Sequence, residues 1–174
     1  MKLLDILFES YNPNDILYHT SNVEHKFSDR GRLHKGTFFS TDMFTSMDYG
    51  DYTYEVKLKP NLNFFDSQNI EHCKLLMQKF GRLHNDFYSK ENVEVYDESL
   101  YYVYDPYQVC RDSHNWIIFE DNPTVMEWLY KTYDGVWVME SVRNLLIFAP
   151  IMDKILTIKM VSSPNKKHPS FYNN

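Results

Sequence analysis

Cysteine and glycine are both scarce in this sequence of 174 residues. The two cysteines, Cys73 and Cys110, lie in no Cys-x-x-Cys pair and in no Cys/His spacing of the kind that zinc sites use. Isolated cysteines are typical of reduced thiols in a cytosolic protein, so we expect a cytoplasmic location and no metal site. There are only five glycines, which argues against a Gly-rich phosphate-binding loop.

Basic clusters and long apolar runs are also missing. The net charge is −6, and the one basic cluster, Lys166 to His168, lies in a polar tail, so direct nucleic-acid binding is not expected. No apolar run approaches the ~18 residues that span a membrane. The start, MKLLDILFES, does not join a basic end to a long apolar core, so we expect neither a signal peptide nor a membrane protein.

The sequence does contain enough apolar material for one folded domain. Hydrophobic residues make up 43% and aromatic residues 17%, which indicates a buried core. Alternating or β-rich segments predict strands, and helical spacing predicts helices. The predicted strands are Ile16–His19, Gly36–Ser40, Tyr52–Leu58, Val136–Met139, Leu145–Phe148 and Ile155–Ile158. The predicted helices are Leu3–Phe8, a segment from Thr41 or Asp42 to Tyr49, Ile70–Phe80, Trp116–Phe119 and Val125–Tyr130.

These elements place strands at both ends of the chain and helices in the middle. We expect residues 1–161 to form a single α+β domain, with residues 68–131 as a helical insertion. Residues 22–35 are expected to be a surface loop and residues 162–174 a flexible C-terminal tail. The tyrosine-rich run Leu100–Tyr107 is ambiguous in type; it suits core packing or, alternatively, a protein-binding surface.

Three separated segments contain the residues of chemical interest: Leu17–Ser21, Gly36–Tyr49, and Tyr133–Gly135 with Asn144–Pro150. In this order they resemble the ADP-ribosyltransferases of the diphtheria-toxin and poly(ADP-ribose) polymerase type, including small phage and mobile-element domains. In that family one strand ends in His-Gly-Ser or His-Gly-Thr, a second reads Gly-Ile-Tyr-Phe-Ala, and a helix then delivers a serine and a tyrosine. Gly36–Tyr49 matches the second part without a gap, and the resemblance covers roughly half of the chain.

The resemblance implies a fold and a substrate. The fold would be ADP-ribosyltransferase-like, with two twisted, mainly antiparallel β-sheets around an NAD⁺ cleft and helices at the periphery. His19 would bind the adenosine ribose, and Ser21 a ribose hydroxyl. The Thr20 backbone and the Ser46 hydroxyl would hold the nicotinamide amide, while Tyr49 would stack on the cationic ring. Taken singly, each of these residues also has a purely structural interpretation.

The sequence departs from the family pattern at two positions. Phe38 stands where the family has a tyrosine, which keeps the ring and loses the hydroxyl group. Asn144 stands where the family has its catalytic glutamate, and an amide cannot act as an anion or a base. Glu140, four residues earlier, is the alternative catalytic carboxylate; its competing interpretation is a solvated surface charge.

The resulting hypothesis is a mono-ADP-ribosyltransferase that transfers ADP-ribose from NAD⁺ to a macromolecule, expected to be a protein. The resemblance to small phage-encoded domains implies an effector that acts on a host or defence protein in the host cytoplasm. The alternative is a catalytically silent module that binds NAD⁺ or inhibits a partner by docking. His72, Cys73, His114 and Trp116 would form a further site only if the fold brought them together.

Overall fold

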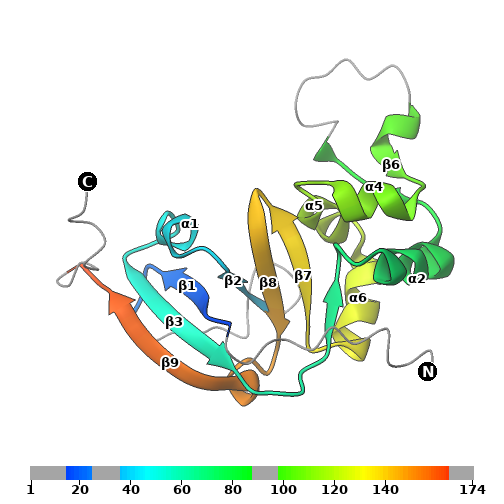
Figure 1. Cartoon of the computed structure of the whole chain (residues 1–174). Coiled ribbons are helices and arrows are strands. Elements are labelled where there is room, and N and C mark those ends of the chain that lie inside the picture. The colour runs from blue at the N-terminus through cyan, green and yellow to red at the C-terminus, as the bar shows by residue number, and fades with distance from the viewer. Residues whose placement is uncertain (1–14, 25–35, 88–97, 165–174) are drawn as a thin grey trace. The chain divides into compact units, whose positions relative to one another are not determined.

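The computed structural model describes residues 15–24, 36–87 and 98–164. Strands and helices are both present, which confirms the α+β class. The chain divides into two compact units: a middle unit, whose described part lies within Asn63–Ser141, and a terminal unit made of Ser10–Leu62 and Val142–Asn174 (Figure 1). The predicted helix Leu3–Phe8, and most of the predicted loop and tail, lie outside the described residues.

The described residues of the terminal unit form five strands of a sheet and one short α-helix. The strands are β1 (Leu17–Ser21), β2 (Gly36–Ser40), β3 (Tyr52–Leu58), β8 (Val142–Phe148) and β9 (Ile155–Ser162). Their order is β8-β2-β1-β3-β9, and every neighbouring pair is antiparallel. Helix α1 (Met43–Met47) follows β2, and the 3-10 helix η3 (Met152–Lys154) precedes β9. β3 and β9 curve together (Figure 1), and their register shifts at two places, as at β-bulges.

Buried and half-buried side chains alternate along this sheet's strand β3, as is typical of a strand with one face in the core. Along β3, Tyr54, Val56 and Leu58 are at most 1% exposed, whereas Glu55 and Lys57 between them are half-buried. β2 begins at a close approach to β8: a Cβ at Gly36 would lie 2.7 Å from the Leu146 side chain and 2.8 Å from a backbone oxygen. Only glycine fits there without a shift of the neighbouring strand.

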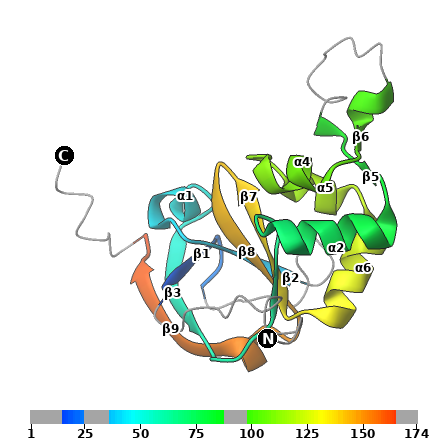
Figure 2. The same ribbon diagram turned by 45° about the vertical axis from the view of Figure 1, so that its right-hand side comes forward.

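The fully described elements of the middle unit are short strands and the helices named below, which Figure 2 shows from a second side. β4 (Phe64–Asp66) and β7 (Gly135–Glu140) pair in parallel. The helices are α2 (Ile70–Phe80), α4 (Pro106–Arg111), α5 (Trp116–Glu120) and α6 (Pro123–Thr132). A small antiparallel pair, β5 (Leu83–His84) and β6 (Tyr102–Val103), stands beside the 3-10 helix η2 (Glu98–Tyr101).

Local sequence signals explain where these helices begin. The Asn69 side chain accepts hydrogen bonds from two backbone N–H groups in the first turn of α2. Asp105 and Gln108 form a reciprocal capping box at the start of α4. Pro106 and Pro123 stand at the first positions of α4 and α6, where the missing N–H costs no hydrogen bond.

Several predicted elements coincide with observed ones. β2, β3 and α2 span the same residues as their predictions. α2, α4 and α5 lie within residues 68–131 and α6 ends one residue later, but the middle unit is wider and includes β4 and β7. β9 continues through Ser162, which pairs with Thr53, so this strand extends into the predicted tail. Within the described ranges, no helix is long and apolar enough to cross a membrane. The arrangement of two sheets around an NAD⁺ cleft stays a prediction.

Candidate functional site

Most of the predicted site residues lie in the terminal unit. His19, Thr20 and Ser21 end β1, which pairs with β3, and Phe38 lies in β2. The remaining three predicted residues of this unit are Ser46 in α1, Tyr49 two residues after α1, and Asn144 in β8. Glu140, the last residue of β7, belongs to the middle unit and is therefore not part of this group.

His19 is held to the neighbouring strand by its ring. Its Nδ1 lies 2.8 Å from the carbonyl oxygen of Phe38, and its ring lies 5.4 Å from that of Phe39. Because a carbonyl only accepts, Nδ1 carries the proton and donates it. Burial lowers the pKa of His19 below its usual 6.5, although the hydrogen bond to Phe38 works in the opposite direction. Near neutral pH the ring is therefore uncharged, and its Nε2 is a hydrogen-bond acceptor.

The lowered pKa of His19 predicts a pH dependence of stability. The unfolded chain takes up a proton near pH 6.5, whereas the folded chain does so only at lower pH. The free energy of unfolding should therefore fall as the pH drops below about 6.5, down to the folded-state pKa. In His19→Gln this contribution disappears, so urea unfolding at about pH 7.5 and about pH 5.5 should show a smaller difference than in the parent. Equal differences in the two proteins would contradict the assignment.

A chain of three hydroxyl groups links β1, α1 and β3. The Thr20 hydroxyl lies 2.9 Å from that of Ser46 and 3.1 Å from that of Thr53. All three residues are at most 8% exposed. Three hydroxyls bring three protons to two mutual hydrogen bonds, so one proton remains for another acceptor. Thr53 was not among the residues expected from the sequence; its register opposite Thr20 in the paired strands identifies it.

Helix α1 positions Ser46 and Tyr49 differently. The Asp42 carboxylate caps the helix by accepting from the N–H groups of Phe44 (2.6 Å) and Thr45 (3.0 Å). The helix then turns Ser46 inward, where it is 4% exposed. The N–H of Tyr49 donates to the Ser46 carbonyl at 3.2 Å, and the Tyr49 side chain is 62% exposed. The Tyr49 ring is therefore exposed, whereas the Ser46 hydroxyl is buried.

Gly50 brings the segment after α1 against the end of β1. A Cβ at this position would lie 2.7 Å from the backbone carbon of Ser21 and 2.8–2.9 Å from two atoms of Asn22. Two of these three atoms belong to the backbone, so only glycine fits without a shift. The Ser21 hydroxyl accepts a hydrogen bond from the Val23 N–H at 3.1 Å, which orders the same corner.

Asn144 and Phe38 lie on the β2–β8 ladder. Asn144 is opposite Ser40 and is 7% exposed, and Phe38 is opposite Leu146 and half-buried. Asn144 therefore belongs to the same sheet as His19, with β2 between their two strands. Its amide contributes a dipole and no charge.

The weaker candidates of the sequence have structural roles in the middle unit. The N–H of Asp66 donates to His72 Nδ1 at 2.7 Å, and the His72 ring stacks on Phe65. The Cys73 thiol donates to the Ser67 carbonyl at 3.1 Å, and burial raises its pKa. These contacts give His72 and Cys73 a structural role in the core of the middle unit.

Comparisons with known proteins identify no relative of this chain. No family model, curated protein or solved structure matches the chain.

Proposed function

We propose that the terminal unit binds NAD⁺ and that the protein is a mono-ADP-ribosyltransferase. The observation that carries this proposal is the joint position of the implied ligands. His19 and Thr20 lie on β1 and Ser46 lies in α1 of the same unit. The Thr20 hydroxyl is hydrogen-bonded to that of Ser46, and the His19 ring is hydrogen-bonded to the Phe38 carbonyl of β2.

Each group supplies a function that NAD⁺ recognition needs. The Nε2 of neutral His19 accepts a hydrogen bond from a ribose hydroxyl. The hydroxyl chain of Thr20, Ser46 and Thr53 has one proton to donate to the nicotinamide carboxamide oxygen. The exposed Tyr49 ring stacks on the positively charged nicotinamide ring, an interaction worth about 0.5–2 kcal/mol.

The proposed reaction exchanges one bond at the ribose. The bond between ribose C1 and the nicotinamide nitrogen breaks, and its electron pair leaves with nicotinamide, which becomes neutral. A nucleophile of the target protein then forms a bond to C1 and loses its proton to solvent. The transition state is cation-like, so nearby negative charge stabilises it and raises the rate of the reaction. Because the amide of Asn144 offers only a dipole, we expect slow transfer of ADP-ribose unless the carboxylate of a different residue contributes.

Tyr49→Ala tests the binding site. Loss of stacking and apolar contact should weaken NAD⁺ binding by about 1–3 kcal/mol, or roughly 5- to 150-fold in Kd. Calorimetric titration of the folded variant measures this change.

Phe44→Ala is the matched control, because Phe44 lies in α1 itself and its ring is also exposed, at 55%. Its Kd should equal that of the parent. Equal Kd values for parent and Tyr49→Ala would remove Tyr49 from the site.

A second candidate function is a catalytically silent NAD⁺-binding protein that acts by docking on a partner. The specific observation in its favour is the buried amide of Asn144 at the position where the resembled family has a glutamate. A thermal shift with NAD⁺, combined with incubation of the chain with labelled NAD⁺ and lysate, separates the two functions. Stabilisation without label transfer favours the silent protein, and label transfer favours the enzyme.

A further inference from the structure

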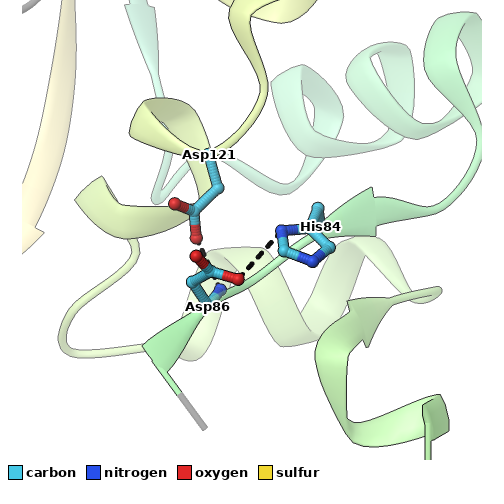
Figure 3. A group of neighbouring side chains, drawn as sticks. All are labelled: His84, Asp86 and Asp121. Carbon is cyan, nitrogen blue, oxygen red and sulfur yellow. Dashed lines mark hydrogen bonds and ion pairs between the residues drawn. The ribbon is translucent and has the colours of Figure 1, made fainter. Parts of the chain in front are cut away.

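Three metal-ligating side chains converge in the middle unit. His84 ends β5, Asp86 follows two residues later, and Asp121 follows α5 (Figure 3). One ligand atom from each residue lies within 4.8 Å of the other two. All three side chains are half-buried, so the group remains accessible to solvent.

The backbone beneath this group is fixed by side chains of the α5–α6 junction. The Asn122 amide donates to the His84 carbonyl at 2.7 Å and accepts from the His84 N–H at 3.0 Å. One oxygen of Asp121 accepts from the Asp86 N–H at 2.5 Å. Between them, the buried Asn85 donates its N–H to the Tyr101 carbonyl at 2.7 Å. Such preorganisation lowers the entropy cost of gathering ligands around an ion.

The spacing of His84 and Asp86 suits coordination better than a charge-assisted hydrogen bond. Their Nδ1 and Oδ1 atoms are 3.4 Å apart. A charge-assisted hydrogen bond between such atoms is about 2.7–2.9 Å long. Two ligands of a tetrahedral zinc ion, each about 2.0–2.1 Å from the metal, are about 3.3–3.4 Å apart. The observed distance therefore matches the edge of a zinc tetrahedron.

The third ligand completes a set that zinc accepts. A carboxylate has two oxygens, so Asp121 can hold the Asp86 N–H with one and coordinate with the other. The two nearby carboxylates repel each other, and a divalent cation between them removes that repulsion. The His84 ring lies 5.3 Å from Tyr102, edge to face, which helps to orient the imidazole.

We propose that His84, Asp86 and Asp121 bind one zinc ion, with the fourth position open to water. Binding is expected with one zinc per folded chain, independently of the NAD⁺ site. No metal site was expected from the sequence: His84 and Asp86 are separated by one residue, but Asp121 is distant in the chain and only the fold adds it.

The test is calorimetric titration of chelator-treated full-length protein with zinc chloride. The parent should show one saturable site. Asp121→Asn, which keeps the acceptor for the Asp86 N–H and removes the charge, should weaken binding by at least about tenfold, and His84→Gln should do the same. Circular dichroism of each variant establishes that it is folded.

Glu120→Gln is the control, because Glu120 is an exposed neighbour of Asp121 and the charge change is the same. It should bind zinc as the parent does. Cobalt(II) in place of zinc should give the absorption of a tetrahedral site in the parent, and this should be lost in His84→Gln. Absence of saturable zinc binding by the parent, or parent-like affinity in both folded ligand variants, would overturn the proposal.

Discussion

Phe65→Ala is expected to lower the free energy of unfolding by about 3–5 kcal/mol, because it empties the centre of the middle unit. Phe65 is 0% exposed. Four rings surround it, with centroid distances of 5.1 Å to His72, 5.6 Å to Tyr133, 6.0 Å to Phe119 and 6.1 Å to Trp128. Removal of the phenyl ring forfeits its buried area and leaves a cavity that rigid aromatic neighbours fill poorly.

Guanidinium unfolding followed by tryptophan fluorescence measures this loss, since Trp128 reports on the same cluster. Phe44→Ala removes the same group from an exposed position, so its free energy of unfolding should stay within about 0.5 kcal/mol of the parent value. A loss below about 1 kcal/mol in Phe65→Ala would show that this cluster is not the packed core described above.

On the hypothesis from the sequence that Glu140 is the catalytic carboxylate, Glu140→Gln is expected to reduce transfer of labelled ADP-ribose by about 100-fold and to leave the Kd for NAD⁺ nearly unchanged. The proposed transition state is cation-like, and Asn144 provides no negative charge. Glu140 is the nearest carboxylate to Asn144 in the sequence. If it serves the reaction, its loss acts on the transition state alone, so kcat falls while binding persists.

Glu71→Gln, a change of the same kind on the exposed face of α2, is the control and should transfer label at the parent rate. Parent-like transfer by Glu140→Gln would identify Glu140 as a surface charge. Asn144→Glu is the reciprocal variant and should raise the rate of NAD⁺ cleavage. If neither the parent nor Asn144→Glu cleaves NAD⁺, the enzyme proposal fails and the silent NAD⁺-binding protein takes its place.

The elements that could be predicted from the sequence are those with strong local signals. β3 alternates polar and apolar residues along its length, and α2 combines helical spacing with an Asn cap and a terminal glycine. Both were therefore predicted with the observed bounds. The same local signals placed Ser46 in a helix and His19 in a strand, although β1 continues to Ser21 and does not end at His19 as predicted.

The elements that were missed depend on contacts distant in the sequence. β4 is only three residues long, and all three are buried through parallel pairing with β7. Asn115 is another case: its buried amide accepts from the Ser67 hydroxyl and the Met139 N–H and donates to the Val109 carbonyl. Nothing local distinguishes it from a loop asparagine. Thr53 and Asp121 were missed for the same reason, since partners from other elements define their roles.

The most direct test of the central proposal is calorimetric titration of the full-length protein with NAD⁺, with nicotinamide and adenosine 5′-monophosphate as separate comparison ligands. We expect one saturable site for NAD⁺ and weaker binding of each fragment, because His19 and Tyr49 are proposed to hold opposite ends of the dinucleotide. Loss of affinity in His19→Ala and Tyr49→Ala, each by about 1–3 kcal/mol, would support the same site. Absence of both a binding heat and a thermal shift at millimolar NAD⁺, with the protein folded, would contradict the account.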